Sequence, residues 1–294
     1  QEINIIDLVK PITKYAKVIS NPNEIDIILN KAYEKMLSDK QGPVWIDIPL
    51  DVQSKYIDLK KIKKFKKKNI KKIKYNSKLS SRILKEINRS KKPLIIIGNG
   101  IHLSNSNKEF KEYLSKVKIP VITSWNASDI IATNNKLYVG RMGIFGEMTA
   151  NLAAQSSDLM IIIGTRLSIP QTGYNKKNFS PNSKKIYIDI DHNEMNSKEF
   201  LNLDVKIKRD IQLFLKETNK FLKNKKIKKF NPWISLINDW KRKYIIGNKI
   251  GNLKSKYINS FDFIDILSKN LNGNETIVTD MGTSFTCTMQ TFKI

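Results

Sequence analysis

The sequence from residue 93 to residue 100 reads Pro-Leu-Ile-Ile-Ile-Gly-Asn-Gly, an apolar run that ends in a glycine-rich turn. A short, continuous apolar run closed by glycine is typical of a strand that a parallel sheet buries on both faces. Similar runs recur downstream, and the segments between them have helical spacing. We predict strands at 93–98, 119–123, 158–164, 185–189 and 205–208, and helices at 79–88, 108–116, 146–155 and 210–221. This alternation predicts an α/β domain with a Rossmann-like parallel sheet over residues 78–219.

Two shorter regions, residues 1–54 and residues 257–294, flank this domain and repeat the alternation of helix and strand. The predicted elements are a helix from about residue 22, a strand at 44–49, a helix at 260–271, a strand at 276–279 and a helix after the turn at 280–284. Neither region is long enough to bury its own apolar residues. We therefore expect each to be part of a larger domain.

The chain is strongly basic, because 53 Lys and Arg against 27 Asp and Glu give a formal charge of +26. Most of the excess lies in residues 55–77, with eleven lysines and one acid, and in residues 220–256, with twelve basic residues and one acid. Clustered positive charge can bind a phosphate backbone. Neither stretch places aromatic residues or glycines in the pattern of a nucleic-acid module. We expect exposed connectors between domains and no nucleic-acid partner.

Other functional classes are disfavoured by the composition. The longest apolar runs are far shorter than the roughly 20 residues of a membrane span, so no membrane insertion is expected. A single cysteine, Cys287, rules out an internal disulfide framework and favours a reducing, cytoplasmic compartment. His102 and His192 have no acidic partners at metal-ligand spacing and are interpreted as loop residues. The sequence therefore assigns no catalytic residue and no metal ligand.

Glycines and polar residues follow the predicted strands at the carboxyl edge of the sheet, where parallel α/β domains bind ligands. The turn Gly98-Asn99-Gly100 predicts either a close backbone approach to a phosphate or a simple tight turn. Arg166 follows the strand at 158–164 and suits either a phosphate or a surface salt bridge. Asp189 suits a ribose hydroxyl, whereas Asp191 is placed to cap the next turn.

Four motifs, in order along the chain, point to a family. They are Val-Lys-Pro-Ile-Thr-Lys-Tyr at 9–15, Gly-Pro-Val-Trp-Ile-Asp-Ile-Pro-Leu-Asp-Val-Gln at 42–53, Gly-Arg-Met-Gly-Ile-Phe-Gly at 140–146 and Thr-Asp-Met-Gly-Thr-Ser-Phe at 279–285. With them the chain resembles thiamine diphosphate (ThDP) enzymes of the acetolactate synthase (acetohydroxyacid synthase) large-subunit type. The resemblance covers nearly the whole chain apart from the lysine-rich stretches.

The resemblance divides the chain into five parts and implies an internal fragment of a longer enzyme. The parts are the C-terminal end of a pyrimidine-binding domain (1–54), a Lys-rich linker (55–77), a central nucleotide-binding-like domain (78–219), a basic linker (220–256) and the start of a pyrophosphate-binding domain (257–294). The fold expected is thus a Rossmann-like central domain between two incomplete α/β domains.

The activity that the resemblance implies is that of a transferase which decarboxylates a 2-keto acid, with pyruvate as donor, as in branched-chain amino acid biosynthesis. It implies ThDP and Mg²⁺ as cofactors, FAD or ADP in the central domain, and a homodimer or homotetramer. The family's catalytic glutamate corresponds to sequence before Gln1, and its metal-binding motif to sequence after Ile294, so we expect the 294 residues alone to be inactive. Two alternatives stay open: a non-catalytic nucleotide-binding or structural module, and a synthase-like paralogue acting on another 2-keto acid.

The residues that the resemblance assigns to cofactors form two groups. Those for a nucleotide are Lys10, Gly98, Gly100, Thr123, Met142, Arg166, Asp189 and Asp210. Those for the diphosphate of ThDP are Met281, Gly282, Thr283 and Ser284. One departure weakens the assignment of FAD. The synthases usually carry charged residues where this chain has Leu-Ser-Ile-Pro-Gln-Thr-Gly at 167–173, a stretch more typical of synthase-like paralogues.

Overall fold

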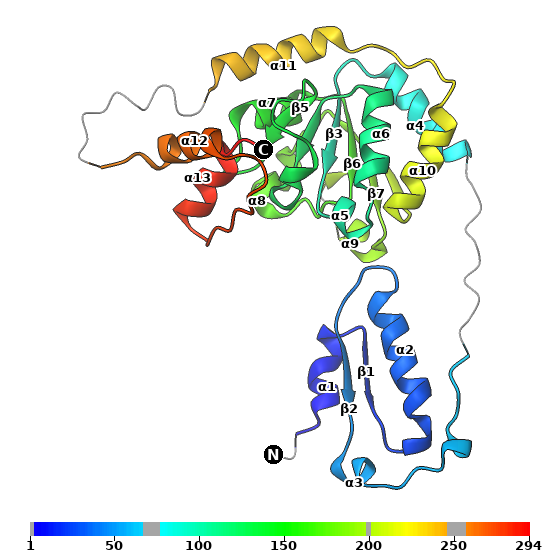
Figure 1. Cartoon of the computed structure of the whole chain (residues 1–294). Coiled ribbons are helices and arrows are strands. Elements are labelled where there is room, and N and C mark those ends of the chain that lie inside the picture. The colour runs from blue at the N-terminus through cyan, green and yellow to red at the C-terminus, as the bar shows by residue number, and fades with distance from the viewer. Residues whose placement is uncertain (1–2, 67–76, 198–200, 246–256) are drawn as a thin grey trace. The chain divides into compact units, whose positions relative to one another are not determined.

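The computed structural model describes residues 3–66, 77–197, 201–245 and 257–294 (Figure 1). The chain divides into two compact units, Gln1–Lys74 and Tyr75–Ile294. Each unit is described by itself below.

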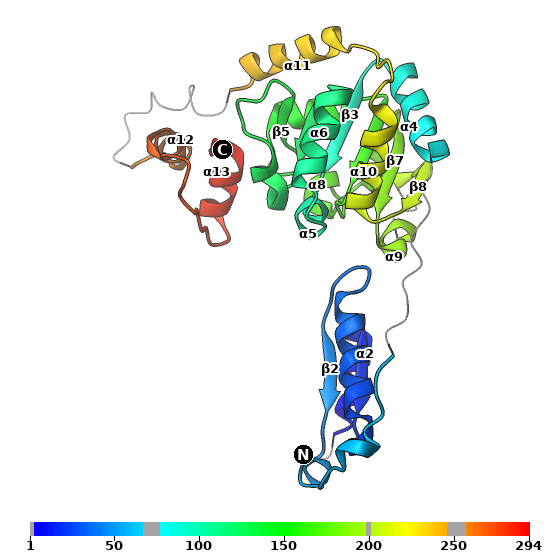
Figure 2. The same ribbon diagram turned by 45° about the vertical axis from the view of Figure 1, so that its right-hand side comes forward.

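The first unit is built on two parallel strands, in which Tyr15 pairs with Val44 and Val18 with Asp47. Helices pack against this strand pair (Figure 2). The elements are α1 (Ile5–Val9), β1 (Tyr15–Val18), α2 (Ile25–Leu37), β2 (Val44–Asp47) and α3 (Leu50–Gln53). The predicted helix and strand of this region are confirmed, whereas β1 was not predicted. Its Tyr-Ala-Lys-Val sequence is too short and too mixed to give a period.

The second unit contains one six-stranded sheet in which every strand pair is parallel. In spatial order the strands are β5 (Tyr138–Arg141), β4 (Val121–Thr123), β3 (Pro93–Ile97), β6 (Leu159–Ile163), β7 (Lys184–Asp189) and β8 (Val205–Lys208). The five predicted strands are confirmed. The edge strand β5 was not predicted, because its Tyr-Val-Gly-Arg sequence combines a glycine and a charge within four residues.

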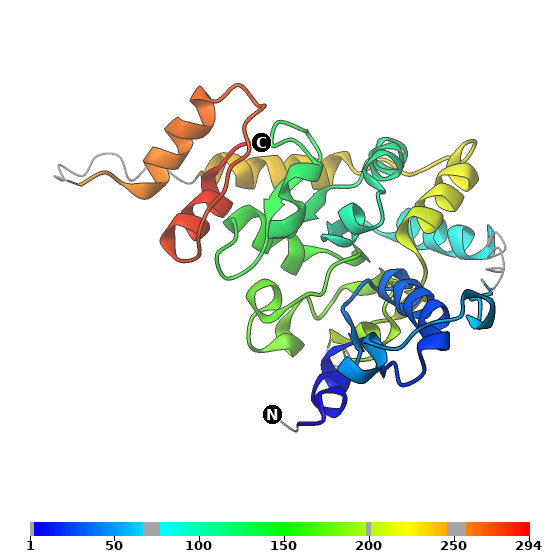
Figure 3. The ribbon, with the colours of Figure 1, turned by 60° about the horizontal axis from the view of Figure 1, so that its bottom comes forward.

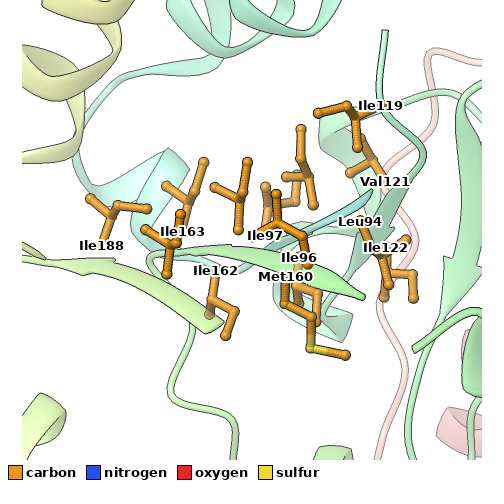
Figure 4. Packing of buried hydrophobic residues seen from close by; sticks show 14 of the residues in the cluster. Leu94, Ile96, Ile97, Ile119, Val121, Ile122, Met160, Ile162, Ile163 and Ile188 are labelled. Atoms are coloured by element: carbon orange, nitrogen blue, oxygen red, sulfur yellow. The ribbon is translucent and has the colours of Figure 1, made fainter. Parts of the chain in front are cut away.

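The core of this unit lies around the two central strands. Every residue of β3 and β6 is buried, and their isoleucines pack with those of the neighbouring strands (Figure 4). The four predicted helices are confirmed as α4 (Ser77–Arg89), α6 (Asn107–Val117), α7 (Met148–Ser156) and α10 (Ile211–Leu222). Helices α4, α6 and α10 lie side by side (Figures 1 and 2). The apolar composition of these strands is thus explained by burial on both faces.

The strand order places a topological switch point between β3 and β6. From β3 the chain proceeds through α6 to β4 on one side, and from β6 it proceeds to β7 on the other. Ligands of open α/β sheets bind at such a point, outside the carboxyl ends of the strands. Here those ends carry Gly98 and Gly164.

One helix, α11 (Asn231–Lys243), lies inside the stretch 220–256 that we expected to be an exposed connector. Its residues Trp233 and Ile237 are buried in the core, and the indole N–H of Trp233 donates to the backbone oxygen of Pro93 at 3.0 Å. The apolar residues of α11 recur at helical spacing, and the charges around them concealed this pattern. Residues 67–76 and 246–256 of the two basic stretches lie outside the described residues.

The C-terminal segment of this unit has two helices, α12 (Ser260–Asn270) and α13 (Thr283–Thr291). Both were predicted, although the side chain of Asn259, not that of Ser260, caps α12. The strand expected at 276–279 is not present in this part of the described chain, where Ile277 and Val278 are exposed. A strand needs a hydrogen-bonded neighbour, and none of the described strands lies beside this segment.

Candidate functional site

The carboxyl edge of the sheet at the switch point is closed by contact between two loops. The N–H of Gly98 donates to the carbonyl of Ile163 at 3.0 Å, and the N–H of Gly100 donates to that of Gly164 at 2.9 Å. A Cβ on Gly98 would lie 2.4 Å from the Gly164 oxygen, and one on Gly100 would lie 2.6 Å from the Gly164 Cα. The glycines are therefore required by packing within the protein. A contact of Gly98 or Gly100 with a nucleotide stays a prediction.

Three predicted polar residues share this edge, and each has a partner within the protein. Arg166 forms an ion pair with Glu194, with 2.8 Å between Nε and Oε2, and this hydrogen bond raises the pKa of the guanidinium above its usual value. A carboxylate oxygen of Asp189 accepts from the N–H of Asp191 at 2.9 Å. The carboxylate of Asp210 caps α10 by accepting from Leu213 N–H at 2.9 Å. Arg166 remains largely exposed, so it is the best placed of the three to meet a ligand.

The other predicted nucleotide residues lie apart from this edge or are covered. Thr123 and Met142 are 0% and 1% exposed and belong to the interior. Lys10 is exposed on a short 3-10 helix, Lys10–Ile12, of the first unit. The N–H groups of Gly98 and Gly100 already donate hydrogen bonds within the protein, so these two groups are not free to bind a phosphate as we expected. The binding of FAD or ADP in the central domain therefore stays a prediction. The hydrogen bonds of Gly98 and Gly100 within the protein do not favour it.

The four residues assigned to the ThDP diphosphate form the turn that opens α13. Met281, Gly282, Thr283 and Ser284 are all exposed. Gly282 has a φ of +93°, a backbone conformation that side chains other than hydrogen disfavour, and α13 begins at the next residue. The first N–H groups of a helix and its dipole attract anions. The turn thus offers backbone donors and the Thr283 hydroxyl to a phosphate group, while the Ser284 hydroxyl donates to the carbonyl of Asp280 at 3.0 Å.

A buried arginine, Arg141, joins the central sheet to α13, and it was not among the site residues predicted from the sequence. Arg141 is 2% exposed, and its guanidinium donates to the carbonyls of Met289 at 2.6 Å and Phe292 at 2.8 Å (Figure 3 shows α13 beside this edge of the sheet). The signal available was an arginine inside an otherwise apolar and glycine-rich motif at 140–146. A charge in such a place is buried only where it has partners.

The interpretation of His102 and His192 as loop residues is wrong, because they lie in the short helices α5 (Gly100–Leu103) and α9 (His192–Asn196). His102 contacts Asp129, with 2.8 Å between Nε2 and Oδ1, and Asn107. Within the described ranges, no three His, Cys, Asp or Glu side chains are grouped closely enough to hold a metal ion. None of the helices that the structure describes is long and apolar enough to span a membrane.

Comparison with known proteins defines the class of this six-stranded domain. Residues 80–218 match the family described as the central domain of thiamine pyrophosphate enzymes, thiamine pyrophosphate being another name for ThDP. This part of the chain therefore matches the central domain of thiamine pyrophosphate enzymes, and the resemblance seen in the motifs is confirmed.

Relatives at the level of single proteins point to one branch of that class. The chain is 33% identical to the probable acetolactate synthase large subunit of Methanococcus aeolicus, over 96% of this chain and 49% of that protein. It is 30% identical to the acetolactate synthase large subunit of Buchnera aphidicola subsp. Schizaphis graminum, again over 96% and 49%. It is 27% identical to acetolactate synthase 1, chloroplastic, of Nicotiana tabacum, over 96% and 42%. The chain thus spans about half the length of these relatives.

Proposed function

We propose that these 294 residues are part of a ThDP-dependent, acetolactate synthase-like enzyme that decarboxylates a 2-keto acid and transfers the product to an acceptor. Pyruvate is the proposed donor. The observation that carries the proposal is the exposed glycine turn at the start of α13, which lies in the same unit as a central domain of this family. Relatives named acetolactate synthase support the choice within the class.

In the proposed enzyme the turn binds the diphosphate of ThDP. Gly282 allows the chain to reverse, so that the N-terminus of α13 faces the anion and the Thr283 hydroxyl donates to a phosphate oxygen. The Ser284 hydroxyl, which donates to the carbonyl of Asp280 in the structure, exchanges that acceptor for a phosphate oxygen. ThDP, when bound, supplies an electron sink for the carbanion left by decarboxylation. The contribution of this chain is to hold and orient the cofactor. We propose that Mg²⁺ and the group that activates ThDP are supplied by other parts of the enzyme.

The partners and the location follow from the same proposal. We propose a cytoplasmic enzyme that works as a homodimer or homotetramer on a small 2-keto acid, without a membrane or nucleic-acid partner. The lysines at 55–66 and 223–229 are exposed. Since they lie on connecting segments without a recognition module, we expect only weak DNA binding that falls steeply with salt.

A second candidate function is a structural module without turnover. It is favoured by the switch point, where the N–H groups of Gly98 and Gly100 are used to join two loops and not to hold a ligand. A synthase-like paralogue with another 2-keto acid as donor is a variant of the first proposal. Assays with several 2-keto acids distinguish the paralogue from a pyruvate enzyme.

The test compares the 294-residue chain with a longer chain that carries its flanking sequence. We expect the short chain to release neither CO₂ nor acetolactate from pyruvate with ThDP, Mg²⁺ and FAD added. The hydrogen bonds of the turn contribute only about 0.5 to 1.5 kcal/mol each, which is too little to hold the cofactor alone. The longer chain should turn over a 2-keto acid. Equal rates for both chains would refute the assignment of the missing groups, and an inactive, folded longer chain would favour the structural module.

A further inference from the structure

Arg141 is the last residue of the edge strand β5, and its side chain contacts the C-terminal end of α13. Its two terminal nitrogens donate to the carbonyls of Met289 and Phe292, at 2.6 and 2.8 Å. The last carbonyls of a helix have no partners within the helix and form the negative end of its dipole. A guanidinium presents several donors in one plane and can satisfy two such carbonyls together. Arg141 therefore caps α13 from a different part of the fold.

The charge of Arg141 is balanced by Glu147. The Glu147 carboxylate accepts from the backbone N–H of Arg141 at 3.0 Å and lies over Gly140. A Cβ on Gly140, whose φ is +140°, would approach the carboxylate to 2.8 Å. Burial raises the pKa of Glu147, while the charges of Arg141 and Lys241 oppose that rise. The motif at 140–146 thus provides the arginine and the space for its counter-charge.

Two further contacts fix α13 on the same surface. Near its first turn, the ring of Phe285 packs edge-on against Trp125, with 5.0 Å between the ring centroids. After its last turn, Ile294 accepts from the N–H of Thr133 at 2.7 Å and donates to the Thr133 hydroxyl at 2.9 Å. The helix is held at both ends, and the exposed turn precedes Phe285 directly.

We propose that Arg141 is a positioning residue, which holds α13 on the central domain and thereby sets the place of the turn Gly282–Ser284. What the turn binds rests on the proposed function, whereas the capping of α13 does not. Replacing Arg141 removes the donor to two partly buried carbonyls, and it removes one of the two positive charges, with that of Lys241, that act on the Glu147 carboxylate. Phe285 and Ile294 keep their contacts, so we expect α13 to become less tightly held without detaching. The sheet should stay folded.

The first experiment is hydrogen exchange on the 294-residue chain. In Arg141→Met we expect amides at 283–292 to exchange at least about ten-fold faster, while those at 93–97 keep their protection. Arg242→Met is the matched control, because Arg242 is an exposed arginine of α11, and it should leave both segments unchanged. Unchanged exchange at 283–292 in Arg141→Met would overturn the proposal, whatever the turn binds.

Chemical rescue separates capping from a general loss of packing. In Arg141→Ala, added guanidinium at a non-denaturing concentration should restore part of the protection at 283–292, and urea at the same concentration should not. Arg141→Lys keeps the positive charge. It replaces the Met and Ala variants in this experiment if those variants also lose protection at 93–97, which would mean that the sheet itself is destabilised. The exchange of Arg141→Lys at 283–292 should lie between wild type and Arg141→Met. No rescue by guanidinium, or wild-type exchange in Arg141→Lys, would contradict a role for the planar donor pair.

The cofactor arm uses the longer chain and a fluorescence titration with ThDP and Mg²⁺, which needs no turnover. We expect Arg141→Met to raise the Kd for ThDP by about ten-fold, or 1.4 kcal/mol. Ser284→Ala tests the turn itself and should also weaken binding. If Ser284→Ala weakens binding and Arg141→Met does not, the positioning role is wrong. If neither variant changes the Kd although α13 loosens, the proposed function of the turn is wrong and the capping stands.

Discussion

The strands β2 and β3 lie in different units and differ in what covers them. Both are short parallel strands led by apolar residues, yet β3 is buried at every position and β2 is fully buried at none. In the second unit the sheet has six strands, with helices packed against it. Among the described residues of the first unit, the buried hydrophobic cluster consists of Ile19, Ile28 and Val52. An apolar strand is buried only where strands beside it and helices above and below it complete the layers.

The difference has consequences for stability. Two strands rarely suffice for an independent fold, whereas a multi-stranded sheet covered by helices does. The first unit leaves Tyr33 and Trp45 61% and 41% exposed. We infer that the second unit dominates the free energy of unfolding of the described chain. The predictions below test this contrast with matched pairs of residues, one from each unit.

The largest effect is expected for truncation of a central isoleucine. Ile96→Ala removes a side chain that is 0% exposed in β3 and should lower the free energy of unfolding by about 2 to 5 kcal/mol. Ile46→Ala, in the middle of the partly buried strand β2, is the matched control and should cost about 1 kcal/mol or less. Urea unfolding followed by circular dichroism measures both. Equal losses would contradict the contrast between the units.

A smaller effect is expected where a methyl group is added to a glycine. In Gly98→Ala the new Cβ would lie 2.4 Å from the Gly164 carbonyl oxygen, so the two loops must separate, at a cost of about 1 to 3 kcal/mol. In Gly42→Ala it would meet only the flexible side chain of Lys14, at 3.1 Å. We expect this control to stay within about 0.5 kcal/mol of wild type, because the Lys14 side chain can move aside. A neutral Gly98→Ala would show that the switch point is not closed by packing.

These pairs also show what could be predicted from the sequence. The apolar runs that became β3 and β6 were decisive because burial on both faces leaves a continuous signal. The edge strand β5 and the short strand β1 left no such signal, since each has a charged residue among four. Helix α11 was missed because its apolar residues, with Trp233, stand between Lys228 and Lys229 on one side and Lys241 to Lys243 on the other. The segment 276–279 was predicted as a strand from its composition alone, although pairing decides whether a strand forms.

The candidate site was less predictable, because the sequence does not show which groups satisfy one another. Gly98 and Gly100 were recognised as special, but only the structure shows that Gly164 is what approaches them. The sequence left two partners possible for Arg166, a phosphate or an acidic side chain, and in the structure it pairs with Glu194. Arg141 was overlooked because its partners are carbonyls about 150 positions away, and backbone acceptors have no sequence signature.

A pH dependence of opposite sign is expected for one glutamate of each unit. Burial raises the pKa of Glu147, so the folded chain binds its proton more tightly, and stability falls as pH rises from the ordinary value of 4.5 through the raised value. The hydrogen bond and the charge of Lys63 lower the pKa of Glu24, so stability falls as pH decreases through the region below 4.5. Glu147→Gln and Glu24→Gln should each remove one of these slopes from the pH dependence of urea unfolding.

The two variants serve as controls for each other, because their pH dependence of stability should change on opposite sides of pH 4.5. Glu147→Gln should flatten the curve only on the side above pH 4.5, and Glu24→Gln only on the side below it. The effect of Glu24→Gln should also vanish in high salt, because the pair with Lys63 is exposed. A loss of slope on the same side in both variants would mean that the two carboxylates do not differ in the way that their burial indicates.

The smallest effect is expected for the exposed ion pair at the carboxyl edge. The Arg166 side chain is 71% exposed, so solvent screens its attraction to Glu194, and Arg166→Ala should lower the free energy of unfolding by only about 0.2 to 1 kcal/mol. Lys63→Ala removes the comparable pair of the first unit and serves as its control. A second test of Arg166 concerns nucleotide binding. If calorimetry detects FAD or ADP binding to wild type, a phosphate contact predicts a loss of about 1.5 to 3 kcal/mol of binding energy in Arg166→Ala. Unchanged binding in that variant would leave Arg166 as a partner of Glu194 alone.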